Sequence, residues 1–267
     1  MLRKAGLGLF TFALWLGVSS SFGPAYALPI DLAVTIQPIQ VRTDDGTMGA
    51  TVGFFEAETD QIWRQAGIDI QFLHATILDD TDFLVLEETT EVIDLFLGAD
   101  HGQHANPLIL NMWFVEEILP PVTTFGIAFV GANGMAISGA VYSFNGGLGR
   151  LDSLAHEIGH NLGLEHTGDA DPLNLMTAGR ARTVPGSIDD ISPNGIQTDQ
   201  LTEDQILVAR ESEFTKAEPI PEPGTLLLFV VGLSSFIMLG AAHTRVERLK
   251  RGRGGGVGKR TQLLTGR

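Results

Sequence analysis

Residues 156–166 read His-Glu-Ile-Gly-His-Asn-Leu-Gly-Leu-Glu-His, and the rest of the chain is organised around them. On a helix, positions i and i+4 share a face, so His156 and His160 can both reach one metal ion. Glu157 stands beside them, next to the coordination position left for water. Gly163 tolerates a left-handed backbone, so the helix can stop there and His166 can return as a third ligand. The stretch therefore predicts a Zn²⁺ site with three imidazole ligands, and one carboxylate that lies near the metal without binding it.

The flanking residues favour a helix independently of the histidines. Asp152 or Ser153 could cap its start. A histidine pair on a helix is often only a hydrogen-bonded pair, but here five positions are fixed at once. An apolar stripe at helical spacing is available for the core, formed by Leu151, Ala155, Ile158 and Leu162.

His156, Glu157, His160, Gly163 and His166 match the extended zinc signature of the metzincin metallopeptidases, and the chain resembles that family. Asn174-Leu175-Met176 looks like the family's methionine turn, with Met176 as an apolar floor beneath the imidazoles. The resemblance spans about residues 29–215 as an architecture, although only residues 156–176 carry specific motifs. Some metzincins place a zinc-contacting tyrosine two residues beyond the methionine, where this chain has Ala178.

The resemblance implies an α+β fold: a mixed five-stranded sheet with two long helices, the second carrying the metal motif, then a small C-terminal subdomain with one helix. It implies a zinc-dependent endopeptidase acting on proteins or peptides. His156, His160 and His166 would hold Zn²⁺, and Glu157 would be the general base toward a metal-activated water. The alternative is a non-catalytic, zinc-stabilised protein of the cell surface or biofilm matrix, although a purely structural site needs no base.

Upstream of the motif, the pattern predicts a strand over residues 30–41, a turn, and an amphipathic helix from about Thr47 to Gly67. A second strand over residues 68–75 would complete a parallel crossover unit. Residues 83–86 and 92–96 could form a short strand and a helix. Residues 108–115 read as a buried strand.

Two more strands are expected over residues 126–130 and 135–144. The resemblance implies that the first is an exposed edge to which a substrate adds as an extended strand. After His166 the pattern becomes loops until Thr202, which with Gln205 makes a capping box for a last helix through about Glu213.

Both ends of the chain resemble targeting segments. Arg3 and Lys4, an apolar run over residues 7–18 and Ala25-Tyr26-Ala27 predict a signal peptide over residues 1–27, with a retained membrane anchor as the alternative. The expected peptidase domain is therefore residues 28–218, exported from the cell.

Pro221-Glu222-Pro223, an uncharged stretch over residues 224–242 and a basic cluster up to Arg253 resemble a PEP-CTERM sorting signal. We assign it to residues 219–253, with a basic cytoplasmic tail over residues 254–267. The resemblance implies a membrane-embedded helix that anchors the chain transiently or permanently, and an exosortase-type partner that cuts near the motif. It also implies a location at the outer surface or the exterior of a Gram-negative bacterium. An ordinary stop-transfer helix is the alternative.

Charge is distributed unevenly along the chain. The whole chain has a formal net charge of -15, whereas residues 28–221 hold 7 basic and 30 acidic side chains. Such a field disfavours nucleic acid and anionic surfaces as partners. The chain has no cysteine, so disulfides and a cysteine-based inhibitory segment are both excluded.

Two weaker groups of residues could bind metals. His101 and His104 with Asp100 could hold a second zinc, although such a pair is more often a solvated loop. Asp79, Asp80 and Asp82 could hold Ca²⁺, but their spacing is not that of a known calcium loop.

Overall fold

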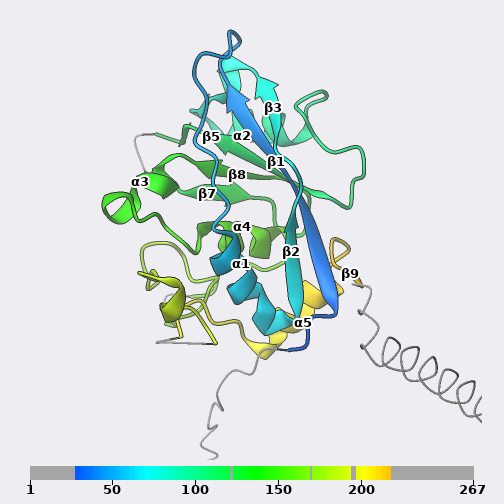
Figure 1. Cartoon of the computed structure of the whole chain (residues 1–267), viewed down its shortest axis with the longest axis vertical. Coiled ribbons are helices and arrows are strands. Elements are labelled where there is room, and N and C mark those ends of the chain that lie inside the picture. Colours follow the sequence, from blue (N-terminus) through cyan, green and yellow to red (C-terminus); the bar gives the residue numbers. More distant parts are fainter. Residues whose placement is uncertain (1–27, 121–122, 169, 194–196, 218–267) are drawn as a thin grey trace, which may run out of the picture. The chain divides into compact units, whose positions relative to one another are not determined.

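Strand β1, Leu32–Arg42, runs through the middle of the sheet and pairs with most of the other strands (Figure 1). Strand β2 (Ile68–Phe72) runs parallel to its first half and β3 (Thr76–Asp79) parallel to its second half. On its other side lie β5 (Leu110–Val115) and then β8 (Met135–Ser138), both parallel. Strand β7 (Gly126–Ala128) closes the order β2-β1-β5-β8-β7 as an antiparallel edge. The sheet is therefore mixed, as expected.

The remaining strands are short. Strand β9 (Lys216–Ala217) adds antiparallel to the start of β1. Strands β4 (Val85–Leu86) and β6 (Glu117–Ile118) form a separate parallel pair. The path of five strands agrees with the expected sheet, and β3 and β9 are additions that the sequence pattern did not predict.

This computed structural model describes residues 28–120, 123–168, 170–193 and 197–217. The chain divides into two compact units, Met1–Glu218 and Pro219–Arg267. The expected signal peptide (1–27), sorting segment (219–253) and tail (254–267) lie outside the described residues. Within the described ranges, no helix combines the length and apolar composition that a membrane crossing requires.

Two hydrophobic clusters lie on the two faces of the sheet, because side chains alternate along each strand. On β5, Met112 and Phe114 enter one cluster, whereas Trp113 enters the other. The first cluster holds helices α1 (Glu56–Trp63) and α4 (Ser153–Asn161), and the second holds α2 (Thr89–Leu97). The predicted strand-helix-strand crossover is confirmed, with a 3₁₀ turn (Arg64–Ala66) extending α1 to Gly67.

The prediction of a strand through residue 144 was wrong, because strand β8 ends at Ser138 and helix α3 (Ala140–Gly147) follows. Ser138 is paired with Val115, the last residue of β5, so no neighbouring strand continues beyond it. Backbone groups without a ladder partner must be satisfied elsewhere, and here a helix satisfies them.

The predicted start of helix α1 at Thr47 was also wrong. Residues 50–55 are not helical, and the hydroxyl of Tyr142 donates to the Gly53 carbonyl (2.7 Å) and accepts from its N–H (3.0 Å). Phe55 has a left-handed backbone (φ 41°), so the helix begins only after it. The expected long helices are short, 8 residues in α1 and 9 in α4.

Helix α5 (Glu203–Glu211) begins at the predicted capping box, in which Thr202 accepts from the Gln205 N–H. Ala209 of this helix and Phe214 beyond it are buried in the same cluster as α1 and α4. The C-terminal segment therefore closes over the same core as the sheet, and a separate subdomain stays a prediction.

Candidate metal centre and active site

Helix α4 carries the metal motif and ends as the sequence predicts. Gly163 has φ 99°, a left-handed value that its lack of a Cβ allows. Its N–H donates to the His160 carbonyl, and the Leu164 N–H donates to the Gly159 carbonyl, both at 2.9 Å. This pair of bonds is a Schellman motif, which turns the chain back toward the helix. His166 is thereby returned to the face that holds His156 and His160.

The three imidazoles converge. The Nε2 atom of His166 lies 3.2 Å from Nε2 of His156 and 3.2 Å from Nε2 of His160. Within the described residues, these three side chains are the group that could hold a metal ion, with ligand atoms all within 4.8 Å of one another. Two nitrogens at about 2.0–2.1 Å from a tetrahedral Zn²⁺ would stand about 3.3 Å apart. The donor set therefore fits zinc.

Backbone carbonyls orient the two helical histidines. Nδ1 of His156 lies 2.7 Å from the Leu175 carbonyl oxygen, and Nδ1 of His160 lies 2.7 Å from that of Leu164. A carbonyl can only accept, so Nδ1 of His160 carries the proton and its Nε2 keeps a free lone pair. Nδ1 of His156 also contacts Nη1 of Arg182, which can only donate. Burial, with Arg182 nearby, lowers the pKa of His156 well below its usual value. The neutral form that metal binding requires is favoured.

Glu157 lies in the same cavity and is buried. Burial raises its pKa to about 8, and the nearby Arg182 and Arg150 partly oppose this rise. A Cβ added at Gly126 of strand β7 would lie 2.6 Å from Cγ of Glu157 and 2.7 Å from its Oε1. The edge strand therefore approaches the carboxylate this closely only because residue 126 is glycine.

Asn161 holds the β7–β8 connection against helix α4. It is completely buried, and its side-chain nitrogen donates to three carbonyl oxygens of that connection, those of Phe129 (3.0 Å), Ala132 (2.7 Å) and Gly134 (3.0 Å). The edge strand is thus fixed relative to the metal ligands by a residue between the second and third histidines.

Met176 is completely buried. A Cβ added at Gly159, midway between His156 and His160, would lie 2.7 Å from its sulfur. The Met176 backbone is positioned by Asn174, whose side-chain oxygen accepts from the Met176 N–H at 2.8 Å. The methionine therefore contacts the helix beside the two helical ligands.

A cavity of about 310 Å³ opens onto these groups. It is bounded by the three histidines and Glu157, by strand β7, and by side chains that come from before and after the metal motif. The latter include Arg150 and Arg182. The cavity places an edge strand, a carboxylate and three imidazoles around one space.

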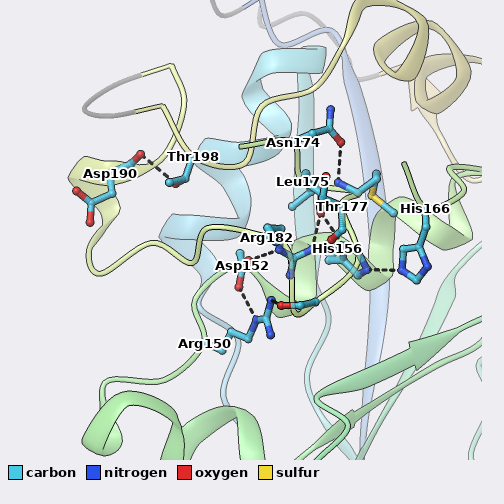
Figure 2. A network of polar contacts seen from close by, with 12 residues as sticks. Arg150, Asp152, His156, His166, Asn174, Leu175, Thr177, Arg182, Asp190 and Thr198 are labelled. Carbon is cyan, nitrogen blue, oxygen red and sulfur yellow. Dashed lines mark hydrogen bonds and ion pairs between the residues drawn. The ribbon is translucent and has the colours of Figure 1, made fainter. Parts of the chain in front are cut away.

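A buried charged network lies behind the cavity (Figure 2). Asp152 is between two arginines: its Oδ2 is 2.7 Å from Nε of Arg182, and its Oδ1 is 3.3 Å from Nε of Arg150. Arg182 also reaches the Leu175 carbonyl and contacts Nδ1 of His156. Asp152, one of the two residues expected to cap helix α4, occupies its N-cap position, but its side chain makes no capping hydrogen bond there.

Asp199 is the fourth member of this neighbourhood and is completely buried. Neither of its carboxylate oxygens has a hydrogen-bond partner within the described ranges. Burial, and then the nearby Asp152, raise its pKa to about 8. The sequence reasoning missed this residue and the two arginines. The sequence did hold one signal for the arginines: residues 28–221 contain only seven basic side chains, and Arg150 and Arg182 are two of them.

The weaker metal candidates are engaged elsewhere. Nδ1 of His101 is directed at the Asp94 carbonyl (3.1 Å), and Nδ1 of His104 accepts from the Asn106 N–H (3.0 Å). Asp79 pairs with Arg42, and Asp80 accepts from the Asp82 N–H. These contacts are those of ordinary loops and turns.

Comparison with known proteins gives one family match. Residues 54–167 match the model of the Reprolysin-like metallo-peptidase family M12B. This range begins before helix α1 and ends just after His166. No curated protein sequence matches the chain.

Several solved structures are similar in part. Mature mirolysin of Tannerella forsythia, solved with a cleaved peptide, is 13% identical, with 67% of this chain and 90% of that chain covered and a TM-score of 0.42. Metalloproteinase-II of Bacteroides fragilis is 17% identical, with 72% and 58% covered and a TM-score of 0.41. Archaemetzincin of Archaeoglobus fulgidus is 14% identical, with 66% and 99% covered and a TM-score of 0.37.

Likenesses at these identities and TM-scores carry no argument about activity. The family match is different, because its range includes strands β2 to β8 and the metal motif, although the central strand β1 lies before it. Together with three imidazoles whose spacing suits one zinc ion, it makes this chain a zinc metallopeptidase.

Proposed function

We propose that the chain is an exported zinc-dependent endopeptidase in which Glu157 is the general base. The observation that carries this proposal is the convergence of the Nε2 atoms of His156, His160 and His166 at the wall of a cavity that Glu157 also lines. A structural zinc site would be closed by a fourth protein ligand, and three ligands leave a position for water.

Bound Zn²⁺ would supply Lewis acidity toward a water and toward the scissile carbonyl. Glu157 would accept the proton of the attacking water and deliver it to the leaving amine. The surroundings of Glu157 suit this role, because a carboxylate that is buried away from water binds a proton more readily than a solvated one. The rise of its pKa to about 8 without metal has this cause.

Strand β7 would bind the substrate. Within the part of the chain that the structure describes, Gly126–Ala128 pair with β8 and with no other strand, and they line the cavity. A peptide can add to such an edge in extended form, with main-chain hydrogen bonds holding its scissile bond beside Glu157. This mode needs no deep pocket, because main-chain hydrogen bonds hold the substrate.

We assign Asn174-Leu175-Met176 as a methionine turn. Two contacts support this: the Leu175 carbonyl oxygen lies 2.7 Å from Nδ1 of His156, and Met176 lies against Gly159. The turn would orient the ring of His156 and provide an apolar floor for His156 and His160. Contacts of this kind hold the rings of metal ligands in the orientation that binding requires.

Export and sorting are also part of the proposal, and they rest on the sequence. The basic, apolar and small-residue order of residues 1–27 supports a signal peptide, and Pro221-Glu222-Pro223 with the following apolar stretch supports an exosortase substrate. A protease released at the surface would meet proteins or peptides there. Cleavage of one specific co-exported partner protein would also agree with this proposal.

The test is peptide hydrolysis by the zinc-loaded full chain and by Glu157→Gln. The variant is expected to keep stoichiometric zinc and to lose activity by a factor on the order of 10² or more. Glu165→Gln, an exposed carboxylate on the same segment, is the matched control and should keep wild-type activity. Equal hydrolysis by wild type and Glu157→Gln would contradict the assignment of the base.

A further inference from the structure

A second cavity adjoins the catalytic one and is larger, about 980 Å³. The two share lining residues, among them Thr123, Phe125, Arg150 and Arg182. A substrate side chain next to the scissile bond can therefore enter the second cavity while its backbone lies on strand β7. Ala178 lines this cavity, and its small side chain leaves the space open.

The charge of this cavity is opposite to that of the domain. Among the described residues, its lining includes three arginines, Arg150, Arg180 and Arg182, and no carboxylate. Residues 28–221 contain only 7 basic side chains against 30 acidic ones, so almost half of the basic residues line one cavity. In an acidic domain, such a cavity concentrates positive potential at the place where substrate would bind.

Arg150 is the central residue of this cavity, because it lines both spaces and is held rigidly. Its Nε donates to Asp152 (3.3 Å), and its Nη2 donates to the Gly179 carbonyl (3.3 Å). Its guanidinium lies 4.9 Å from the ring centroid of Phe125. Within the described residues its Nη1 has no hydrogen-bond partner. A fixed guanidinium with free N–H donors is suited to a carboxylate, because little side-chain entropy is lost on pairing.

Among the described residues, Asp152 is the carboxylate that forms ion pairs with these arginines, and it pairs with both Arg150 and Arg182. Asp199 is also buried nearby, and burial raises its pKa to about 8, which favours its uncharged form. Glu157 lines the catalytic cavity but not this one. Arg180 at the exposed rim adds a third positive charge. The carboxylate of an acidic ligand would compensate the excess positive charge of the arginines, whereas a basic ligand would be repelled by it.

We infer that this cavity is a specificity subsite for acidic side chains, so that the preferred substrates carry Asp or Glu beside the scissile bond. The inference rests on the proposed peptidase function. Arg150 is the specificity-determining residue, pairing with the substrate carboxylate, and Arg180 attracts that carboxylate from the rim.

The first experiment compares matched peptides that differ only by Glu or Gln at one position, scanned over three positions on each side of the scissile bond. For the zinc-loaded full chain, kcat/KM is expected to be at least about 10-fold higher for Glu at one position. Arg150→Met keeps an apolar stem of similar length and should bring that ratio to within about 2-fold of unity. Arg180→Gln should lower it in part.

Arg64→Gln is the matched control, because Arg64 is exposed and lines neither cavity; its ratio should equal the wild-type ratio. Zinc content and circular dichroism establish that Arg150→Met is folded. Should that variant not fold, Arg180→Glu serves in its place, and reversed charge should lower the preference below that of Arg180→Gln.

The second experiment separates this inference from the proposed function by measuring binding. Fluorescence anisotropy with the Glu157→Gln chain should show tighter binding of the Glu peptide than of the Gln peptide, and Arg150→Met should abolish the difference. Binding preference without any cleavage by wild type would contradict the peptidase proposal and support the subsite. Equal cleavage or equal binding of the two peptide series at every position would overturn the subsite.

Discussion

Gly126 and Glu157 come from distant parts of the chain and are fitted to each other at the scale of single atoms. Gly126 is on the edge strand and Glu157 is on the metal helix, yet an added Cβ on the glycine would lie within 2.8 Å of three atoms of the carboxylate side chain. Contacts this short do not occur with a real Cβ. The glycine is therefore a positioning residue for the proposed base.

For Gly126→Ala, we expect kcat to fall by a factor on the order of 10², because displacement of a reacting group by about 1 Å has effects of that size. Zinc content should stay stoichiometric, since the three histidines are not displaced. Gly168→Ala is the control, because a Cβ there meets nothing within 4 Å. Unchanged kcat in Gly126→Ala would show that Glu157 has another resting position.

Asp199 makes folding depend on pH. Its pKa is raised from 3.8 to about 8 because it is buried and lies near Asp152. The folded chain therefore keeps a proton that the unfolded chain loses above about pH 4. Its contribution to stability is complete below that pH and is lost as the pH rises through about 8.

Asp199→Asn should remove this dependence. Between pH 6 and 9, the zinc-saturated variant should lose less stability than wild type, by on the order of 1 kcal/mol, or about 2–4 °C in Tm. Melting by circular dichroism at the two pH values gives the comparison, with exposed Asp189→Asn as the control. Identical pH profiles for wild type and Asp199→Asn would mean that Asp199 ionises normally in the folded chain.

At the scale of elements, helix α4 depends on a charge network at its start as well as on the metal at its other end. Asp152, with no exposed side-chain surface, pairs with Arg150 and Arg182, which are themselves buried. Removing one partner of a buried ion pair leaves an uncompensated charge, which costs far more than an exposed pair contributes.

Asp152→Ala should therefore lower the free energy of unfolding by about 3–5 kcal/mol. Asp79→Ala, which breaks the exposed pair with Arg42, should lower it by about 0–1 kcal/mol. Denaturant unfolding of both variants measures the difference. Similar losses in the two variants would show that the network contributes no more than a surface ion pair.

The parts of the site that could be predicted from sequence are those set by local spacing. The positions of His156, His160 and Gly163 on one helix and its end follow from helical geometry and from the conformational freedom of glycine. Strands β1, β2 and β5 follow likewise from local alternation. The end of strand β8 could not be predicted, because it depends on where the neighbouring strand β5 stops.

The charged network could not be predicted for a related reason. Arg150, Asp152, Arg182 and Asp199 form no recognisable spacing, and the chain brings them together only through the loops after His166. Their burial against one another is a property of the tertiary structure. The same holds for Gly126, whose importance appears only once the edge strand lies beside helix α4.

At the scale of the whole molecule, zinc should hold helix α4 and the segment that carries His166 together. His166 is exposed and follows the helix, whereas Met176 and Leu175 belong to the loop beneath it. A ligand that binds only the folded chain stabilises it by mass action, about 2.7 kcal/mol at a concentration 100 times its Kd. In a chain without disulfides, this is a large share of the stability.

Chelation should therefore lower Tm by roughly 5–10 °C at near-neutral pH, as 1 kcal/mol corresponds to about 2–4 °C in a domain of this size. His166→Ala should lose most of this zinc-dependent shift, whereas His104→Ala, whose ring is engaged in its own loop, should retain it. Scanning calorimetry with and without added zinc gives both shifts. A Tm that chelation leaves unchanged would contradict a stabilising metal.

The central claim is that three imidazoles bind one zinc ion, and X-ray absorption at the zinc edge of the full chain tests it most directly. The account predicts one zinc per chain with three imidazole nitrogens at about 2.0–2.1 Å, and loss of one imidazole from that shell in His166→Ala. Zinc that is absent, substoichiometric, or unchanged in its ligands when His166 is replaced would contradict it.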